Sequence, residues 1–170
     1  MNIRYIVLIL FAIVSCRNNP EKHNVDLRPG KTEMADLNKY LVQKDRERIL
    51  NYIERKNLKM VESKTGLWYQ ITVEGEGNSF TDNSKIIMEY ECSLLDGTVC
   101  YTSDKLGRKV LVLGKSDIEQ GMNEGLRLLR PGSKATFIIP PYLAYGLVGD
   151  RKMIPSRAII VYNVNILQAK

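Results

Sequence analysis

The stretch that decides the fold reads IIPPYLAYG and occupies residues 138–146 of this 170-residue chain. Proline cannot donate to a strand ladder, so a strand must end at about Ile139, before the proline pair. Tyr142 and Tyr145 then lie on a short loop or turn just beyond a rigid strand end, which is a typical place for a binding pocket. A corner whose tyrosines only plug the end of a core is the alternative interpretation.

Apolar periodicity predicts strands on both sides of this stretch. Residues 86–94 alternate apolar and polar side chains, as in a strand with one inward face, and Asp96-Gly97 is a two-residue hairpin signal. We predict further strands and one helix, capped by Ser116 or Asp117, in these segments: strands 67–73, 99–102, 110–113, 134–139 and 159–168, and a helix over 118–129. Several strands with a single short helix predict an α+β fold.

The first fifteen residues have the features of an export signal. Arg4 supplies a positive start, and the apolar run at residues 5–14 is too short to span a bilayer. The ending IVSC, residues 13–16, resembles the bacterial lipobox, which implies cleavage before Cys16 and acylation of its thiol. A short N-terminal anchor with an incidental cysteine is the alternative. Arg17 stands where an aspartate would mark inner-membrane retention, so the expected location is the outer membrane of the cell envelope, facing the periplasm.

The remaining organisation follows from composition. Residues 16–30 are polar and contain two prolines, which predicts a flexible tether. A helical extension is expected at 31–63 and the main domain at 64–170. The helix, over 31–57, carries two narrow apolar stripes: Val42, Ile49 and Ile53; Met34, Leu37 and Leu41. Packing against its own domain and contact with a dimer mate or another partner are both open alternatives.

Charge and composition argue against several classes of partner. The net charge is +6, but the basic residues are spread along the chain rather than gathered in a stripe, which argues against a nucleic-acid site. The single histidine, His23, has no cysteine or acidic neighbours and is expected to be solvated. The sequence therefore predicts no nucleic-acid partner, no metal and no cofactor.

Four stretches together, in this order and at this spacing, resemble the FK506-binding-protein (FKBP) family of peptidyl-prolyl isomerases. They are YECSLLDGTVCY at 90–101, LGKSDIEQGMNEGLRLLRPG at 113–132, IIPPYLAYG at 138–146 and MIPSRAIIVY at 153–162. The resemblance covers about residues 65–168. It implies an antiparallel sheet half wrapped around one short helix, with a pocket for proline-containing polypeptides between helix and sheet.

Peptidyl-prolyl isomerisation needs neither an acid–base pair nor a metal. Its barrier of about 18–20 kcal/mol comes from amide resonance, so a catalyst must favour the twisted amide. An apolar pocket for the proline ring and a donor for the twisted carbonyl can do this. Residue by residue, the resemblance implies catalytic roles for Tyr90, Tyr145 and Ile154, and places in the substrate pocket for Ile118 and Tyr162.

The substrate pocket also departs from the family pattern. Cys100 and Tyr101 stand where the family usually has Phe-Asp, and Met122 replaces the Trp of the pocket floor. Methionine fills irregular space but forms a softer floor than indole. Glu119 stands where an aliphatic residue is common, although the family role at this position belongs to the backbone N–H. Lys109 stands where an apolar pocket residue is usual.

The sequence leaves open whether Cys100 or Tyr101 of the hairpin faces inward. A strict two-residue turn pairs Leu94 with Val99 and Cys92 with Tyr101, so Tyr101 would face inward. The resemblance instead places Cys100 inward, and a bulge would reconcile the two. Because this geometry puts Cys92 and Cys100 on opposite faces, we predict free thiols even in an oxidising compartment.

Two functions from different classes remain. The first is a membrane-anchored isomerase for exported proteins, with activity weakened by the substituted pocket. The second is a largely non-catalytic binding or assembly lipoprotein of a cell-envelope motility or secretion machine. The layout, from lipobox through tether and helix to an altered domain of this family, is similar to a gliding-motility lipoprotein of that family in Bacteroidetes, which fits either function.

Overall fold

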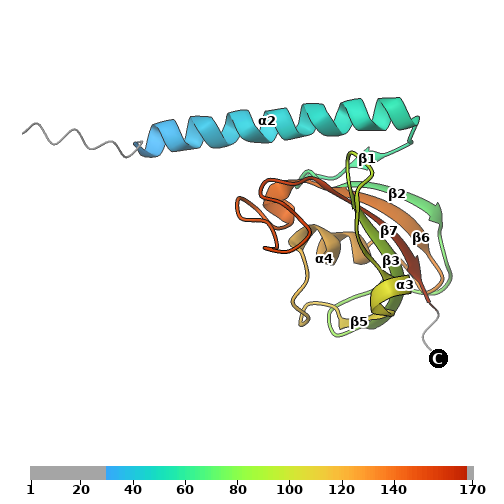
Figure 1. Cartoon of the computed structure of the whole chain (residues 1–170). Helices are drawn as coiled ribbons and strands as arrows, with labels where there is room; N and C mark the ends of the chain where they lie inside the picture. The colour runs from blue at the N-terminus through green and yellow to red at the C-terminus, as the bar shows by residue number, and fades with distance from the viewer. Residues whose placement is uncertain (1–29, 168–170) are drawn as a thin grey trace, which may run out of the picture. The chain divides into compact units, whose positions relative to one another are not determined.

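A computed structural model describes residues 30–167, and from Leu37 onward the chain forms one compact unit. The elements in chain order (Figure 1) are α2 (Lys31–Lys56), β1 (Val61–Glu62), β2 (Trp68–Val73), β3 (Lys85–Leu94), β4 (Val99–Thr102), α3 (Ser103–Leu106), β5 (Lys109–Val112), α4 (Gln120–Leu126), β6 (Lys134–Ile139), η1 (Pro141–Leu143) and β7 (Ile160–Ile166). The expected export signal and Cys16 lie outside the described residues. None of the helices within 30–167 is long and apolar enough to cross a membrane.

The strands form one antiparallel sheet, which confirms the predicted α+β fold. Their order is β1-β2-β6-β7-β3-β4, and β5 also pairs with β3. β6 ends at Ile139, directly before the proline pair, as predicted. The sheet starts earlier than expected, because Val61 and Glu62 pair with β2 within the segment assigned to the helical extension. The sheet curves around α4 (Figure 1).

Both faces of the central strands are buried. Phe137 and Tyr162 belong to the large core cluster on the α4 side of the sheet. Their neighbours Ile138 and Val161 belong to a second cluster, which includes Ile49 of α2. Alternate residues of a strand point to opposite faces, so a strand covered on both sides reads as a continuous apolar run. The runs FII in β6 and IVY in β7 have this origin.

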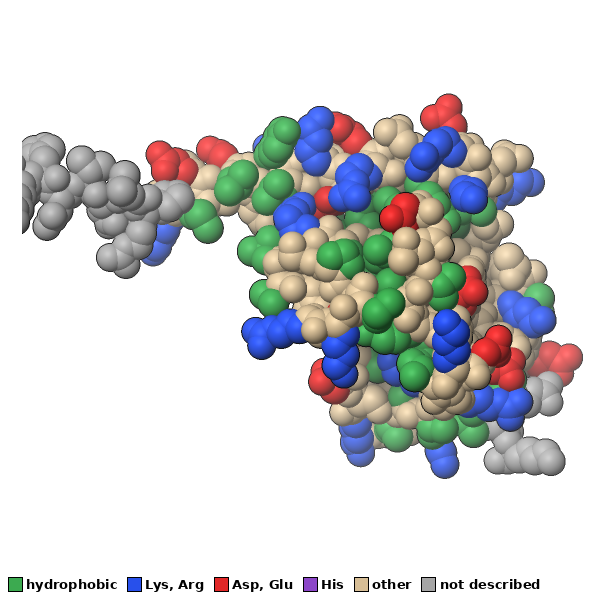
Figure 2. Space-filling view, in the orientation of Figure 1, with side chains coloured by type: hydrophobic (Ala, Val, Ile, Leu, Met, Phe, Trp, Pro, Cys, Tyr) green, Lys and Arg blue, Asp and Glu red, His purple; other side chains and the backbone are tan. Residues whose placement is uncertain are grey.

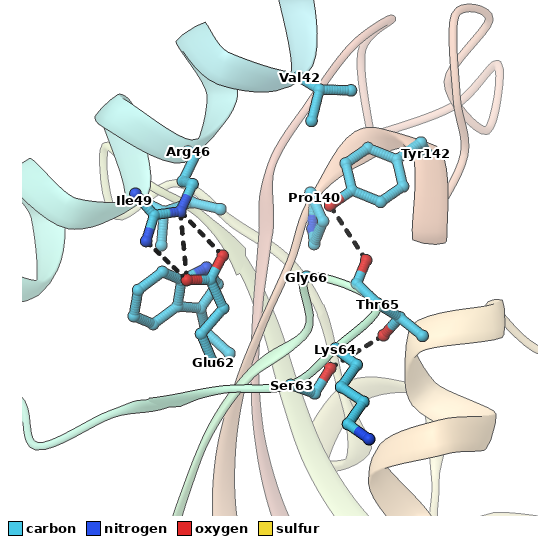
Figure 3. Close-up of a pocket in the computed structure, with 11 residues that line it drawn as sticks. Val42, Arg46, Ile49, Glu62, Ser63, Lys64, Thr65, Gly66, Pro140 and Tyr142 are labelled. Carbon is cyan, nitrogen blue, oxygen red and sulfur yellow. Dashed lines mark hydrogen bonds and ion pairs between the residues drawn. The ribbon is translucent and has the colours of Figure 1, made fainter. Parts of the chain in front are cut away.

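Helix α2 packs against its own domain through the first of its two apolar stripes. Ile49 is 1% exposed and lies in one cluster with Trp68. Beside it, the Arg46 guanidinium lies 5.8 Å from the centre of the Trp68 ring and hydrogen-bonds Glu62 at 2.8 Å (Figure 3). Leu37 of the second stripe is exposed. Contact of that second stripe with a dimer mate or partner stays a prediction.

Helix α4 is shorter than predicted. The helix spans Gln120–Leu126 rather than 118–129, because Ser116 accepts a hydrogen bond from the Val112 N–H instead of capping, and Glu119 keeps an extended ψ of 140°. Gly121 and Gly125 allow close approach to β6: a Cβ at Gly125 would lie 2.8 Å from the Phe137 ring. After Leu126 the chain continues with tighter i→i+3 bonds.

The hairpin formed by β3 and β4 contains a bulge, which reconciles an inward Tyr101 with an inward Cys100. Cys92 lies opposite Tyr101, as predicted, but Val99 lies opposite Ser93 rather than Leu94. Cys100 is therefore the extra residue on β4. Both Cys100 and Tyr101 pack against the large core cluster, so both line the same side of the sheet.

Candidate active site

The turn that follows the proline pair after β6 directs its two tyrosines, Tyr142 and Tyr145, to different parts of the molecule. The carbonyl of Pro141 accepts backbone hydrogen bonds from the following turn, and the buried Leu143 side chain anchors it. The hydroxyl of Tyr142 donates to the backbone oxygen of Thr65 at 3.2 Å (Figure 3). Tyr145 instead packs against the core cluster beneath α4. Only the second tyrosine of PPYLAYG therefore belongs to the candidate site.

The structure brings all nine predicted site residues together. Met122, Ile154 and Tyr162 are buried members of the large core cluster, with exposed fractions of 0%, 2% and 2%, and we call these three residues the floor of the candidate site. Five half-buried residues pack against the same cluster as walls: Tyr90, Ile118 and Tyr145, with Cys100 and Tyr101 of the bulged strand. The ninth residue, Glu119, joins them through hydrogen bonds. The contributing elements are β3, β4, α4, β7 and two loops.

Glu119 lies at the centre of the site, and its side chain is buried. The hydroxyl of Tyr145 donates to its Oε1 at 2.5 Å, and the hydroxyl of Tyr162 donates to the same oxygen at 2.8 Å. The other oxygen, Oε2, is buried and has no hydrogen-bond partner among the described residues. We call Glu119, Tyr145 and Tyr162 the Glu119 cluster. Sequence reasoning assigned a role only to the backbone of Glu119 and missed the role of its carboxyl group.

The electrostatics of the Glu119 cluster keep both phenols protonated. Burial, followed by the nearby Glu119 carboxylate, raises the pKa of Tyr162. Burial and the hydrogen bond to Glu119 raise the pKa of Tyr145. A phenol has one hydrogen to donate, and in both tyrosines that hydrogen points to Glu119. In this arrangement neither phenol offers its hydrogen to a bound carbonyl.

Asp150, which the sequence analysis did not single out, holds one wall of the site. One of its oxygens accepts from the Tyr101 hydroxyl, and the other accepts from the N–H groups of Lys152 and Ile154, each at 2.8 Å. Burial alone would raise the pKa of Asp150, but these hydrogen bonds outweigh burial and lower it. An aspartate that bonds the N–H two residues on is an Asx-turn, which a turn-rich GDRK segment could have indicated.

The substitutions at Cys100 and Lys109 are both accommodated at the edge of the site. The sulfur of Cys100 lies 3.6 Å from the backbone oxygen of Met153. The Tyr90 ring packs against Tyr162 at 6.1 Å between centres, tilted by 47°. The Lys109 ammonium lies 5.9 Å from the centre of the Tyr90 ring, a cation–π contact in place of an apolar one.

A separate cavity of about 370 Å³ lies between α2 and the start of the sheet (Figure 3). Arg46, Trp68 and Tyr142 line it, and none of the predicted site residues does. Residue 66 adopts φ +95°, a backbone conformation that favours glycine, and the Tyr142 hydroxyl lies beside it. This cavity has no counterpart in the sequence analysis.

Comparisons with known proteins identify the family. The family model for FKBP-type peptidyl-prolyl cis-trans isomerases matches residues 76–167, which is more than half of the chain. A probable FKBP-type peptidyl-prolyl cis-trans isomerase, FkpA, of Neisseria meningitidis is 32% identical over 148 residues, 87% of this chain and 49% of that protein. The peptidyl-prolyl cis-trans isomerase Mip of Coxiella burnetii is 34% identical over 105 residues, 62% of this chain and 45% of that protein.

A solved structure agrees with this assignment. The crystal structure of FkpA from Escherichia coli has a TM-score of 0.66 at 25% identity, and the match covers 100% of this chain and 74% of that one. The chain spans about half the length of the curated relatives it matches. With the family model spanning β3 through β7 and the fold matching, the chain belongs to the family of FKBP-type peptidyl-prolyl cis-trans isomerases.

Proposed function

We propose that this chain isomerises X-Pro bonds of exported polypeptides while anchored to a membrane through a lipidated Cys16. The observation that carries the proposal is that the three floor residues, the five wall residues and Glu119 pack together or hydrogen-bond one another. Membership of the family supports the chemistry. The expected export signal and lipobox support the location and the class of client.

The site has the parts that the reaction requires. The floor residues Met122 and Ile154 and the wall residue Tyr90 provide apolar surface for a proline ring. Such a surface lowers the barrier when it favours the twisted amide over the planar one. The donor for the twisted carbonyl is the Tyr145 hydroxyl, once its hydrogen is released from Glu119.

The activity is weaker than it would be with an aromatic floor. Aromatic pairs contribute about 0.5–1.5 kcal/mol beyond the area that they bury. Replacing an indole by Met122 should therefore cost about 1 kcal/mol in the transition state, which is roughly tenfold at most in rate. A site that has methionine in place of tryptophan but keeps its other parts predicts slow catalysis rather than none.

The engaged hydroxyls favour a second candidate function. Both phenols of the Glu119 cluster donate within the protein, and the Tyr101 hydroxyl donates to Asp150. A site in which these three phenolic hydrogens are engaged within the protein is suited to holding a polypeptide without twisting its amide. In that case the chain is a largely non-catalytic binding or assembly lipoprotein of a cell-envelope motility or secretion machine.

Proline-limited refolding of a model protein separates the two functions. Uncatalysed X-Pro exchange takes tens to hundreds of seconds, so modest acceleration is measurable. With residues 31–170, which retain every element of the structure, the refolding rate should rise with protein concentration. Tyr145→Phe should lower the acceleration and Tyr145→Ala should lower it further. Tyr142→Phe is the matched control, because that tyrosine lies in the same loop but bonds Thr65 outside the site.

Met122→Trp completes the test. If the site is only softened, indole in place of methionine should raise the rate up to tenfold. Circular dichroism should first establish that this larger side chain is accepted at a fully buried position. Refolding no faster than in buffer for the wild type and for a folded Met122→Trp variant would overturn the isomerase proposal in favour of the binding module.

A further inference from the structure

The Glu119 cluster presents hydrogen-bond acceptors rather than donors. Both phenolic hydrogens point to Oε1 of Glu119, so the free positions on Tyr145 and Tyr162 are oxygen lone pairs. Oε2 of Glu119 is a further acceptor, and it is buried without a partner. A buried unpaired acceptor costs free energy until a donor reaches it.

The described part of the chain supplies no cation to this carboxyl group. The ion pairs among residues 30–167 involve other acids, and none includes Glu119. Lys109, the basic residue at the edge of the site, lies over the Tyr90 ring. Asp150, the other carboxylate beside the site, has both oxygens hydrogen-bonded. The unmet requirement of the site is therefore one donor at Glu119.

We propose that Glu119 sets substrate specificity by accepting a hydrogen bond from a lysine or arginine side chain next to the substrate proline. This inference rests on the proposed isomerase function and names the class of polypeptide that it acts on. Hydrogen bonds between ionised groups are shorter and stronger than neutral ones, and they are strongest where water is excluded. Glu119, which is 7% exposed, meets that condition.

The same contact releases the catalytic donor. Oε1 now holds the hydrogens of both tyrosines, and the 2.5 Å bond from Tyr145 is the shorter of the two. When a substrate cation binds Oε2, it gives the carboxylate a donor that compensates for the loss of the Tyr145 bond at Oε1. The freed Tyr145 hydroxyl then turns its hydrogen to the carbonyl of the X-Pro bond, while Tyr162 keeps Glu119 in place. A substrate without a donor must break the Tyr145 bond with no compensation.

The test measures kcat/KM for peptides that differ at one position. The purified full chain in detergent micelles would be assayed with Ala-Lys-Pro-Phe, Ala-Leu-Pro-Phe and Ala-Glu-Pro-Phe, and with the peptide that carries lysine directly after proline. The wild type should prefer one of the lysine peptides over the leucine peptide by about tenfold, which corresponds to one charged hydrogen bond. The glutamate peptide should be the poorest.

Variants assign this preference to one side chain. Glu119→Gln keeps the shape and removes the charge, and Glu119→Leu frees Tyr145 altogether. Both should bring the lysine-to-leucine ratio to about one, and Glu119→Leu should raise the activity on the leucine peptide because Tyr145 no longer has a bond to break. Glu91→Gln is the matched control, because Glu91 is exposed on β3 and changes the net charge equally. A ratio taken within one variant is insensitive to partial loss of folded protein.

The outcomes separate this inference from the isomerase proposal. If the wild type and Glu119→Gln are both active and have the same ratio of kcat/KM for the lysine and leucine peptides, Glu119 does not set specificity. The isomerase proposal is then unaffected. If neither the wild type nor any variant accelerates the isomerisation of any peptide, the isomerase proposal fails. Calorimetric titration then tests whether Glu119 recognises a lysine peptide. Tighter binding of a lysine peptide that is lost in Glu119→Gln upholds recognition by Glu119, and equal binding of the lysine and leucine peptides overturns it.

Discussion

Cys92 and Cys100 show at the scale of single residues how environment decides chemistry. Both thiols are free. Cys92 is fully buried, and burial raises the pKa of its thiol to about 12. Cys100 is half-buried at the bulge, where burial also raises its pKa, and its sulfur contacts the backbone oxygen of Met153. The thiolate is the reactive form. Burial therefore protects Cys92 in two ways, because it keeps reagents away from the sulfur and keeps the thiol protonated.

This difference predicts the order of alkylation. At pH 8 a thiol with a pKa near 12 is about one part in ten thousand thiolate, so iodoacetamide should modify Cys100 well before Cys92 in the folded protein. The rate at Cys92 should rise with pH, because the thiolate fraction rises. Mass mapping of peptides from a time course measures both sites, with urea-unfolded protein as the control in which the two react alike. Equal rates in the folded protein would contradict the burial of Cys92.

At the scale of elements, one arginine connects helix α2 with the loop that carries Tyr145. The Arg157 guanidinium donates to Asp45 of α2 at 2.6 Å, and the Arg157 backbone N–H donates to the Gly146 carbonyl at 2.9 Å. Arg157 adopts φ +54°, a left-handed conformation that side chains avoid unless their surroundings hold it. Asp45 is 3% exposed, so its removal leaves a cation without its partner.

Asp45→Ala should therefore lower the free energy of unfolding by roughly 1.5–3 kcal/mol, the range for a hydrogen bond between charged groups. Urea unfolding followed by Trp68 fluorescence measures this change, because Trp68 is the sole tryptophan and packs with Ile49 of α2. Glu54→Ala is the control on the same helix, exposed and expected to change stability by less than about 0.5 kcal/mol. A change no larger than the control would show that the pair does not hold α2 in place.

At the scale of the whole molecule, the proposed anchor and the proposed catalyst are separate parts of one chain. Lipidation of Cys16 predicts incorporation of labelled palmitate, loss of residues 1–15 and recovery of the protein with membranes. Cys16→Ala should abolish all three. Cys100→Ala is the control, since it removes a cysteine from the folded domain. Labelling that persists in Cys16→Ala would contradict the anchor.

Local features of the sequence account for most of the strands, and they are the basis for the predicted set of site residues. β6 is bounded as predicted because proline removes a ladder donor whatever its surroundings. The alternation in β3 shows its inward face for a similarly local reason. The order and spacing of four stretches predicted nine site residues, and the fold places eight of them in or against one core cluster, with Glu119 hydrogen-bonded to two of the eight. The predicted start of helix α4 was wrong because Ser116 has an alternative hydrogen-bond partner in β5.

Interactions between residues far apart in the chain were decided by the tertiary structure alone. Asp45 and Arg157, 112 residues apart, form a pair that no periodicity marks. The bulge at Cys100 depends on how β4 fits β3, since a hairpin signal specifies the turn but not an extra residue beyond it. From the sequence, only the backbone N–H of Glu119 was expected to have a role in the substrate pocket, and no pattern marks a partner for its carboxyl group. It is buried because the chain brings two phenols from other elements to the same oxygen. Sequence determines what each residue can do locally, and only the packed fold determines which partners a polar group meets.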